Sequence, residues 1–421
     1  MARVSLTIIE AWSESGQDSS SRDKLKTRKL MQKVTLKKSA LPAFRTLPAW
    51  IYGSQLESLP SSLEQGELVH LYSPKQEFLA LGYINPKSQI ALRILSFTQK
   101  SFTPEELKKR LQKAILKRES LLLKTNGARL IHSESDELPG LIVDSYANHL
   151  SLQINTAGME RFRPLILESL KELLSPLSII DKSDEKSRQL EGLESSNGVI
   201  FGEVPQEILL QEEGARFGIN LLEGQKTGYY LDQRQNRLLL AEMAKGKRVL
   251  DLFCNGGGFG IHALLKGAKE ALFIDSSEMA CEQVKKNLSL NQLENKGRII
   301  SANVFDELKG LREREEKFDL IILDPPSFAK TKEQQKGAMN GWKYLIIGAI
   351  KVAAPKARIA LYSCSYHMGL NELAQVALEA SRDSYTRLQI LQYHLQDIDH
   401  PAILNMPHSL YLRGIVFEVL K

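Results

Sequence analysis

An alternation of short apolar runs and amphipathic segments between Lys247 and Ser365 most constrains what this chain can fold into. The first apolar run ends in a glycine-rich turn, LDLFCNGGGFG. A strand, a tight glycine turn and a helix in that order are typical of doubly wound folds, because only glycine lets the backbone approach a nucleotide-like ligand so closely. Such a turn alone is a weak indicator, so the interpretation depends on the order and spacing of the strands and polar residues downstream of it.

Seven strands are predicted in this C-terminal region, with helices between most of them. Because a helical crossover separates each of the first five strands from the next, we expect those five to be parallel. Ligands of such sheets bind outside the carboxyl ends of the strands. The sequence therefore predicts an α/β fold with a Rossmann-like, seven-stranded doubly wound sheet. The predicted strands are 248–253, 270–275, 298–303, 319–323, 358–363, about 387–394 and 414–420.

The residues before this region show other patterns. Residues 32–97 alternate apolar runs with turn signals, which favours a small β-rich module, and each of its five prolines would end a strand or lie on an edge. Farther along, GLIVDSYANHLSLQI indicates a hairpin with Ala147 and Asn148 near its turn. The charged, Ser-rich stretch from Lys182 to Asn197 is expected to be an exposed loop. We predict a basic, flexible arm at 1–31, the β-rich domain at 32–97, a central α/β domain at 98–210 and the C-terminal domain at 211–421.

Length and composition are those of a soluble protein with two to three domains. The chain has 421 residues, of which 43% are hydrophobic, and no apolar run approaches the roughly 20 residues that span a bilayer. The N-terminal apolar stretch is too short and too acidic for a signal peptide. Three cysteines over this length do not suggest a disulfide scaffold, so a cytoplasmic protein is the simplest expectation.

The formal net charge of +6 comes entirely from the front of the chain. Residues 1–50 hold ten Lys and Arg against four acids. Such an arm would gain affinity for a polyphosphate backbone by releasing counterions. The alternative is a solvated, flexible tail, which the Ser-rich stretch around Asp18 also favours.

Polar side chains lie at the predicted ends of the first three strands. Asp251 lies in the first strand, and Asp275 ends the second strand 24 residues later. In dinucleotide folds an acid about 20 residues past the glycine turn accepts hydrogen bonds from ribose hydroxyls, so Asp275 is a candidate for that role. The alternative is an acid at a helix N-terminus. Asn303 follows the third strand, where its amide oxygen could accept a hydrogen bond from an adenine amino group.

The segment Asp324-Pro325-Pro326-Ser327-Phe328 follows the fourth strand. A carboxylate at a strand end, two residues of fixed φ and then an aromatic ring form a rigid lip suited to a planar base. The alternative is an ordinary proline-rich turn. The position at the carboxyl edge of the sheet favours the functional interpretation.

Cys364 follows the fifth strand, beside Asp324 in the predicted sheet. A lone cysteine is more often a small buried hydrophobic residue, and Cys254 and Cys281 are interpreted in that way. Carbon 5 of a pyrimidine is a poor nucleophile toward a methyl donor. Addition of a thiolate at carbon 6 makes carbon 5 enamine-like, and a nearby carboxyl group can hydrogen-bond N3 and the exocyclic amine. The pair therefore indicates methyl transfer to a pyrimidine carbon.

These residues resemble bacterial 23S rRNA (cytosine-C5) methyltransferases of the ribosomal RNA large subunit methyltransferase I family, which use S-adenosylmethionine. The similarity runs from about residue 32 to the C-terminus, and GQKTGYYLDQR is its most specific stretch. The family combines an N-terminal PUA RNA-binding domain, a central α/β domain and a Rossmann-like class I methyltransferase domain. The matching stretches are ESDELPGLIVD (134–144), GQKTGYYLDQRQNR (224–237), LDLFCNGGGF (250–259), EKFDLIILDPPSF (316–328), YSCS (362–365) and DHP (399–401).

The resemblance implies roles for individual residues. Cys364 would be the nucleophile and Asp324 the acid that engages the cytosine, and no metal is expected. The base would lie against Pro325, Pro326, Ser327 and Phe328. Contacts to S-adenosylmethionine are implied for Asp251, Phe253, Asn255, Gly256, Gly257, Gly258, Asp275, Ser276, Asn303, Val304, Gln233, Arg234 and Asp324.

Two positions depart from the family pattern. Asn303 stands where relatives usually have an acid, and Ser327 stands where the better-known RNA cytosine-C5 enzymes keep a second cysteine that assists release of the adduct. Another base must then remove the carbon 5 proton.

The expected partner is 23S ribosomal RNA, of the large subunit or its precursor. No membrane association is expected. Two other functions stay open: a guanine-N7 rRNA methyltransferase, which needs no thiol, and a non-catalytic RNA-binding ribosome-assembly factor. A homodimer is also left open.

Overall fold

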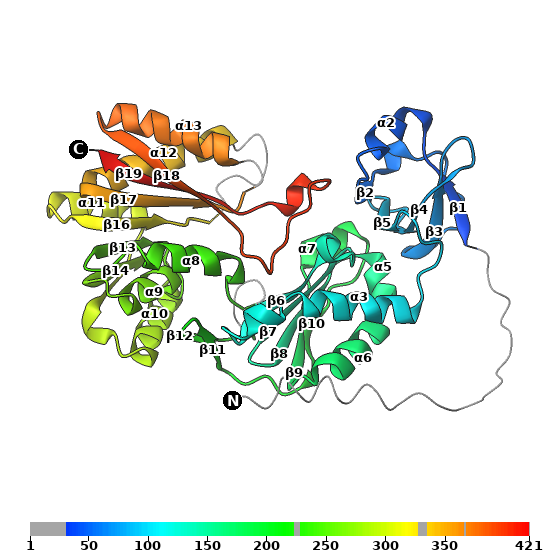
Figure 1. The fold of residues 1–421 in the computed structure, drawn as a ribbon, viewed down its shortest axis with the longest axis horizontal. Coiled ribbons are helices and arrows are strands. Elements are labelled where there is room, and N and C mark those ends of the chain that lie inside the picture. The colour runs from blue at the N-terminus through cyan, green and yellow to red at the C-terminus, as the bar shows by residue number, and fades with distance from the viewer. Residues whose placement is uncertain (1–30, 223–227, 327–334, 366–367, 421) are drawn as a thin grey trace.

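The computed structural model describes residues 31–222, 228–326, 335–365 and 368–420, which form three β-sheets of five or more strands and one two-stranded sheet. The basic arm lies almost wholly outside the described residues. Figure 1 shows the three large sheets in three separate parts of the molecule, which we call the N-terminal, central and C-terminal modules. The domain boundaries expected from the sequence stay predictions.

The N-terminal module is β-rich, as the sequence predicts. Its sheet has the order β1-β3-β4-β5-β2, in which only β1 and β3 pair in parallel. Pro42 is an exception to the expectation for the prolines, because it lies in the first turn of helix α2 (Leu41–Phe44). Proline is tolerated there since the first helical N–H groups have no partner within the helix. The strands are β1 (Gln32–Thr35), β2 (Trp50–Ile51), β3 (Glu67–Tyr72), β4 (Phe78–Ile84) and β5 (Leu92–Ser96).

The central module is a five-stranded sheet of order β10-β9-β8-β7-β6. The predicted hairpin is confirmed: β7 and β8 pair antiparallel, and Ala147 and Asn148 both have positive φ, 48° and 69°, as a type I′ turn requires. Helices α3 and α6 pack on one face of the sheet. The elements are α3 (Pro104–Leu116), α4 (Glu119–Leu122), β6 (Gly127–His132), β7 (Leu141–Tyr146), β8 (His149–Ile154), α5 (Ala157–Arg161), α6 (Arg163–Leu174), β9 (Ser178–Lys182), α7 (Glu185–Leu190) and β10 (Asn197–Gly202).

The stretch from Lys182 to Asn197 corrects one expectation, because it is not an exposed loop. It contains helix α7, which begins after Asp184, whose carboxylate accepts a hydrogen bond from the Ser187 N–H. Two of its charged residues are buried: Arg188 binds the backbone oxygen of Ile154, and Glu191 pairs with Arg93 of the N-terminal module. Most of the stretch is exposed, as its composition predicted, but it forms a helix and buries these two charged residues through their partners.

The C-terminal module is the predicted seven-stranded doubly wound sheet, of order β15-β14-β13-β16-β17-β19-β18. The first five strands of the sequence are parallel, as expected, and β19 is antiparallel to both of its neighbours. The strands are β13 (Arg248–Leu252), β14 (Glu270–Asp275), β15 (Gly297–Ser301), β16 (Phe318–Leu323), β17 (Ala353–Ser363), β18 (Arg387–Leu395) and β19 (Arg413–Leu420).

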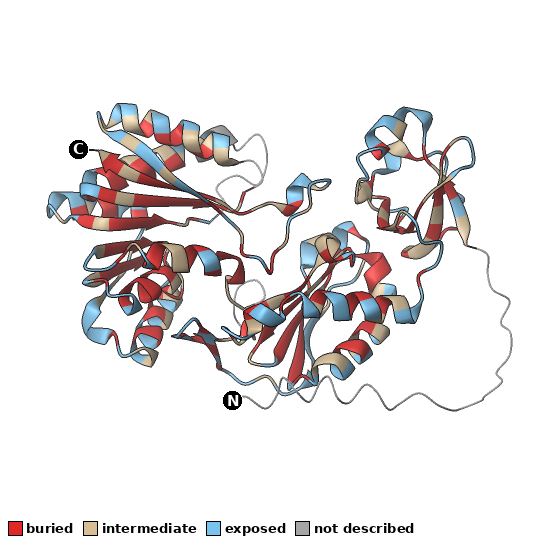
Figure 2. Cartoon of the chain, viewed as in Figure 1, coloured by how far each residue is buried: buried red, intermediate tan, exposed pale blue. Residues whose placement is uncertain are grey.

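Helices cover both faces of this sheet, because its strands alternate apolar side chains toward the two sides. One face packs against α8, α9 and α10, and the other packs against α11, α12 and α13. Figure 2 shows the strands largely buried between helices whose outer surfaces are exposed. The helices are α8 (Arg234–Ala241), α9 (Gly258–Leu265), α10 (Glu278–Leu290), α11 (Val304–Glu313), α12 (Gln335–Val352) and α13 (Leu370–Asp383).

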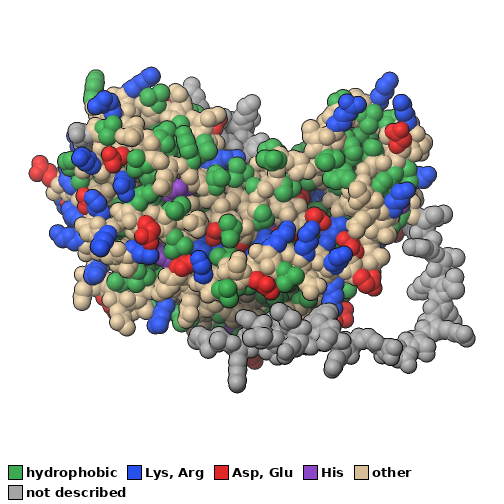
Figure 3. All heavy atoms as spheres, in the orientation of Figure 1, with side chains coloured by type: hydrophobic (Ala, Val, Ile, Leu, Met, Phe, Trp, Pro, Cys, Tyr) green, Lys and Arg blue, Asp and Glu red, His purple; other side chains and the backbone are tan. Residues whose placement is uncertain are grey.

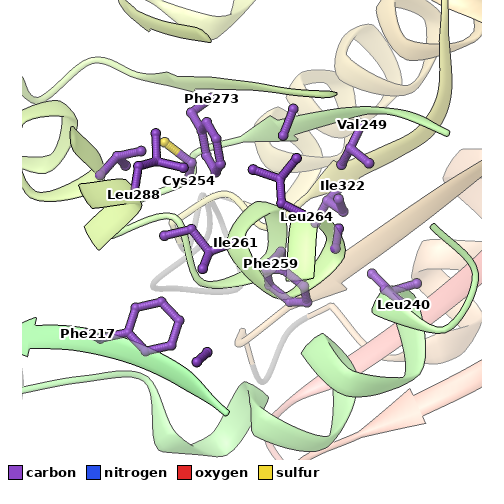
Figure 4. Close-up of a cluster of buried hydrophobic side chains, with 14 of the residues drawn as sticks. Phe217, Leu240, Val249, Cys254, Phe259, Ile261, Leu264, Phe273, Leu288 and Ile322 are labelled. Carbon is purple, nitrogen blue, oxygen red and sulfur yellow. The ribbon is translucent and has the colours of Figure 1, made fainter. Parts of the chain in front are cut away.

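The core on the α9 side sets how closely the glycine turn approaches the sheet. Phe273 packs there beside Ile261 and Cys254, which is buried like an apolar residue (Figure 4). A Cβ on Gly260 would lie 2.2 Å from the Phe273 ring. Glycine is therefore required for α9 to pack this closely on the sheet.

Two connections join the C-terminal module to the rest of the chain. A two-stranded sheet, β11 (Ile208–Glu212) with β12 (Ala215–Ile219), contacts β6 on one side and α10 on the other. The loop of residues 396–412, between β18 and β19, extends toward the N-terminal module (Figure 1), where the His408 and Trp50 rings stack at 5.9 Å. Figure 3 shows the surface hollowed between these two modules. None of the described helices is long and apolar enough to cross a membrane.

Candidate functional site

The glycine turn after β13 is held in an unusual backbone conformation. Phe253, Asn255 and Gly257 have φ values of 60°, 48° and 78°. Glycine and asparagine tolerate this left-handed region, but an aromatic residue there is uncommon and costs roughly 1–2 kcal/mol. Strain of this kind persists where the surroundings impose it, and it is concentrated at functional sites.

Two carboxylates brace the turn. Asp275 accepts a hydrogen bond from the Asn255 N–H at 3.0 Å with one oxygen and from the Ser277 N–H at 3.0 Å with the other. Asp251, 1% exposed, accepts a hydrogen bond from the Gly260 N–H at 2.9 Å. Asp275 therefore supports both the turn and the start of α10, and its remaining lone pairs are compatible with the predicted ribose contact.

Burial raises the pKa of Asp251 to about 8. The hydrogen bond from the Gly260 N–H opposes this shift, whereas the negative charges of Asp324 and Asp275 add to it. The charges of Asp324 and Asp275 thus place negative potential at the carboxyl edge of the sheet. A cationic ligand would be stabilised there.

Asn303 and Val304 lie at the end of β15, where α11 begins. The Asn303 amide oxygen accepts a hydrogen bond from the Phe305 N–H at 2.9 Å and so caps the helix. Val304 is buried. Asn303 is exposed, and the second lone pair of its amide oxygen is compatible with the predicted hydrogen bond from an adenine amino group.

Asp324 and Cys364 each follow the end of one of two adjacent strands. Leu323 of β16 pairs with Leu361 of β17 in parallel register, so both side chains lie beyond the same edge of the sheet. Both residues are half-buried. Gln233 donates a hydrogen bond to Asp324 at 3.1 Å, which brings the YYLDQR stretch to this edge.

The structure describes only part of the segment that is predicted to lie against the base. Pro325 is buried and Pro326 is exposed, whereas Ser327 and Phe328 lie outside the described residues. Ser276, also predicted at the donor site, is exposed just after Asp275.

Arg234 departs from its predicted position in the donor pocket. Its guanidinium is 2% exposed and contacts Asp397 at 2.7 Å, with Glu212 and Asp399 at 3.3 Å. It also donates to the Gly127 oxygen of the central module at 2.7 Å. These partners give Arg234 a structural role, joining two modules, rather than a contact with the donor.

Tyr229 was missed by sequence reasoning. Its hydroxyl is buried without a hydrogen-bond partner among the described residues, and a Cβ on Gly258 would lie 2.9 Å from it. The Arg237 guanidinium lies 4.7 Å from the centre of its ring and is held by Glu212. The hydroxyl thus faces the glycine turn. The YYLDQR motif could have drawn attention to Tyr229, but the sequence does not show which way each side chain of the motif points.

Within the described residues, no three or more His, Cys, Asp or Glu side chains are arranged to hold a metal ion.

Comparison with family models identifies two parts of the chain. Residues 34–97 match a PUA-like domain, and residues 236–343 match the family described as conserved hypothetical protein 95. Among solved structures, a protein assigned as a methyltransferase and solved with SAH superimposes with a TM-score of 0.80 at 21% identity, covering 92% of this chain and all of that one. A protein from Streptococcus mutans assigned as a SAM-dependent methyltransferase gives 0.78 over the same shares. These likenesses confirm the predicted fold.

Curated relatives match over most of the chain. Ribosomal RNA large subunit methyltransferase I of Tolumonas auensis is 38% identical over 88% of this chain and 95% of its own length. The enzyme of the same name from Aliivibrio fischeri strain ES114 is 33% identical over 92% of this chain and 99% of its own. The chain therefore belongs to the ribosomal RNA large subunit methyltransferase I family.

Proposed function

We propose that this protein transfers a methyl group from S-adenosylmethionine to carbon 5 of a cytosine in 23S ribosomal RNA, in the cytoplasm. Family membership supports an S-adenosylmethionine-dependent RNA methyltransferase. The observation that carries the finer assignment is the placement of Asp324 and Cys364 after two neighbouring parallel strands. A thiol and a carboxyl at one edge are the two groups that C5 chemistry requires.

The residues present fit the cofactor. The backbone of the turn packs closely on the protein at Gly256, Gly257 and Gly258, and the buried hydroxyl of Tyr229 faces it at Gly258. The negative potential from Asp275 and Asp324 suits a sulfonium cation. When bound there, S-adenosylmethionine supplies an electrophilic methyl group.

In this mechanism the Cys364 thiolate adds to carbon 6 of the cytosine, forming a carbon–sulfur bond and placing electron density on carbon 5. Asp324 engages N3 and the exocyclic amine, and the hydrogen bond from Gln233 holds its carboxyl group in position. Once carbon 5 has taken the methyl group, a base other than Cys364 takes up the carbon 5 proton. The electron pair of that C–H bond then expels the Cys364 thiolate and restores the double bond.

Substitution of the nucleophile tests the mechanism. Cys364→Ala should abolish methyl transfer and leave the affinity for S-adenosylmethionine, measured by calorimetry, nearly unchanged. Cys281→Ala is the matched control, because that thiol is buried in the fold and should be dispensable for transfer. Normal turnover by Cys364→Ala would exclude the covalent route.

Nucleoside analysis tests the base. Ribosomal RNA lacking the modification, taken from a strain without the gene, should yield 5-methylcytosine after incubation with the protein. A product of 7-methylguanosine would support the guanine-N7 alternative instead, and failure to bind S-adenosylmethionine would support a non-catalytic assembly factor.

The basic arm is proposed to bind RNA through its charge. Deletion of residues 1–31 should weaken RNA binding and reduce its dependence on salt, because fewer counterions are released. Filter binding over a salt series measures both. An unchanged slope of log affinity against log salt would refute this role.

A further inference from the structure

A cavity of about 380 Å³ lies between the central and C-terminal modules. Strands β7 and β8 and helix α7 form one wall. The segment 229–232 and two residues of the loop 396–412 form the other. The volume lies at the small end of the range for ligand pockets, about 300–1,000 Å³, and suits a single nucleoside. The side chains able to contact such a ligand through rings or polar groups include Arg129, Gln153, Asn155, Tyr230, His400 and Tyr411.

The walls of this interdomain cavity are fixed by hydrogen bonds. The Tyr411 hydroxyl donates to Asp232 at 2.7 Å, and the Tyr411 ring lies nearly parallel to that of His132, 29° apart. Arg129 binds both oxygens of Asp144, at 2.7 and 2.8 Å. A pocket whose side chains are already held loses little entropy when it takes up a ligand.

The charges of the cavity disfavour an anion. Arg129 is neutralised by Asp144, and His400 lies 2.6 Å from Asp399. Two further lining residues, Asp184 and Asp232, are acids. A phosphate would find no uncompensated cation among the lining residues. The other lining groups include the rings of Tyr230 and Tyr411 and the side-chain amides of Gln153 and Asn155.

Flat aromatic surfaces together with amide groups recognise an uncharged, planar, hydrogen-bonding ligand, as in proteins that bind unstacked RNA bases. The cavity is also connected to the edge of the sheet that carries Asp324 and Cys364. Tyr230 lines the cavity, and three residues later in the same segment Gln233 binds Asp324. We infer that the interdomain cavity binds a base of the RNA near the target nucleotide, splayed out of its stack. The inference rests on RNA as the substrate and not on cytosine as the target.

Substitutions of Tyr230 test whether its aromatic ring contributes to RNA binding, apart from other effects of changing the residue. Tyr230→Leu should weaken binding of protein-free 23S rRNA from the deletion strain by about five- to a hundredfold, the range expected when a base loses its stacking partner. Tyr230→Phe, which keeps the ring, should bind within about twofold of the unsubstituted protein. Tyr393→Leu is the matched control, since that ring is 56% exposed on β18, outside the cavity.

A second measurement identifies the base. Mass spectrometry of the product RNA first locates the methylated nucleotide. In a short transcript around it, one abasic substitution near that nucleotide should weaken binding to the unsubstituted protein and have no further effect with Tyr230→Leu. Equal RNA affinity of Tyr230→Leu and the unsubstituted protein would overturn the inference, as would a loss of affinity for S-adenosylmethionine in that variant. A methylated base other than cytosine would contradict the proposed function and leave this inference standing.

Discussion

At the residue scale, Asp251 connects the fold to the charge of the site. Its pKa is raised to about 8 in the folded protein by burial, whereas an unfolded aspartate titrates near 3.9. Because the folded state holds the proton more tightly, this group favours folding at acidic pH. That contribution is lost as pH rises from about 4 through about 8.

Asp251→Asn should therefore flatten the decline in the free energy of unfolding between pH 5 and about 8.5. Asparagine keeps an oxygen to accept the Gly260 N–H but does not titrate. Urea unfolding followed by circular dichroism at several pH values measures the difference between the two proteins. Parallel pH profiles would contradict the raised pKa. Asp383→Asn, at an exposed position paired with Lys343, is the control.

At the scale of elements, the sequence predicted the secondary structure that depends on short-range patterns of residues. The seven strands, the parallel pairing of the first five and the 147–148 hairpin turn follow from apolar periodicity and turn chemistry, which act over a few residues. The loop predicted from Lys182 to Asn197 was wrong in part: a helix forms there, and Arg188 and Glu191 are buried by partners distant in sequence. Arg234 illustrates the same limit, since its partners come from 212, 397 and 399.

The packing of α9 on the sheet gives a prediction at this scale. Gly260→Ala places a methyl group 2.2 Å from the Phe273 ring, so the helix or the ring must shift, at a cost of about 1–3 kcal/mol. The displaced turn should also bind S-adenosylmethionine more weakly in calorimetry. Gly337→Ala is the control: nothing lies within 4 Å of its added Cβ, and stability should be unchanged or slightly higher. Equal stability of both variants would show that the core accommodates the methyl group.

At the scale of the whole molecule, buried ion pairs join the central and C-terminal modules. Asp399 accepts a hydrogen bond from the Arg129 N–H, contacts Arg234 and lies beside His400, while its backbone oxygen binds Arg118. Burial alone would raise the pKa of Asp399, but His400, Arg234 and the hydrogen bonds outweigh it and hold the pKa well below its usual range. Its stabilisation is therefore present above about pH 4 and is lost as pH falls further.

Asp399→Asn should destabilise the protein by roughly 3–5 kcal/mol at neutral pH, because Arg234 remains buried with part of its compensating charge removed. Since the lost contacts lie between modules, calorimetric unfolding should change from one transition toward separate transitions of the two parts. Glu242→Gln is the matched control, as its pair with Lys266 is exposed and worth at most about 1 kcal/mol. A single transition with unchanged midpoint in Asp399→Asn would mean that apolar contacts, rather than these charges, hold the modules together. The destabilisation should shrink as pH falls below about 4, because the unfolded chain of the unsubstituted protein then binds a proton at Asp399 that the folded protein does not.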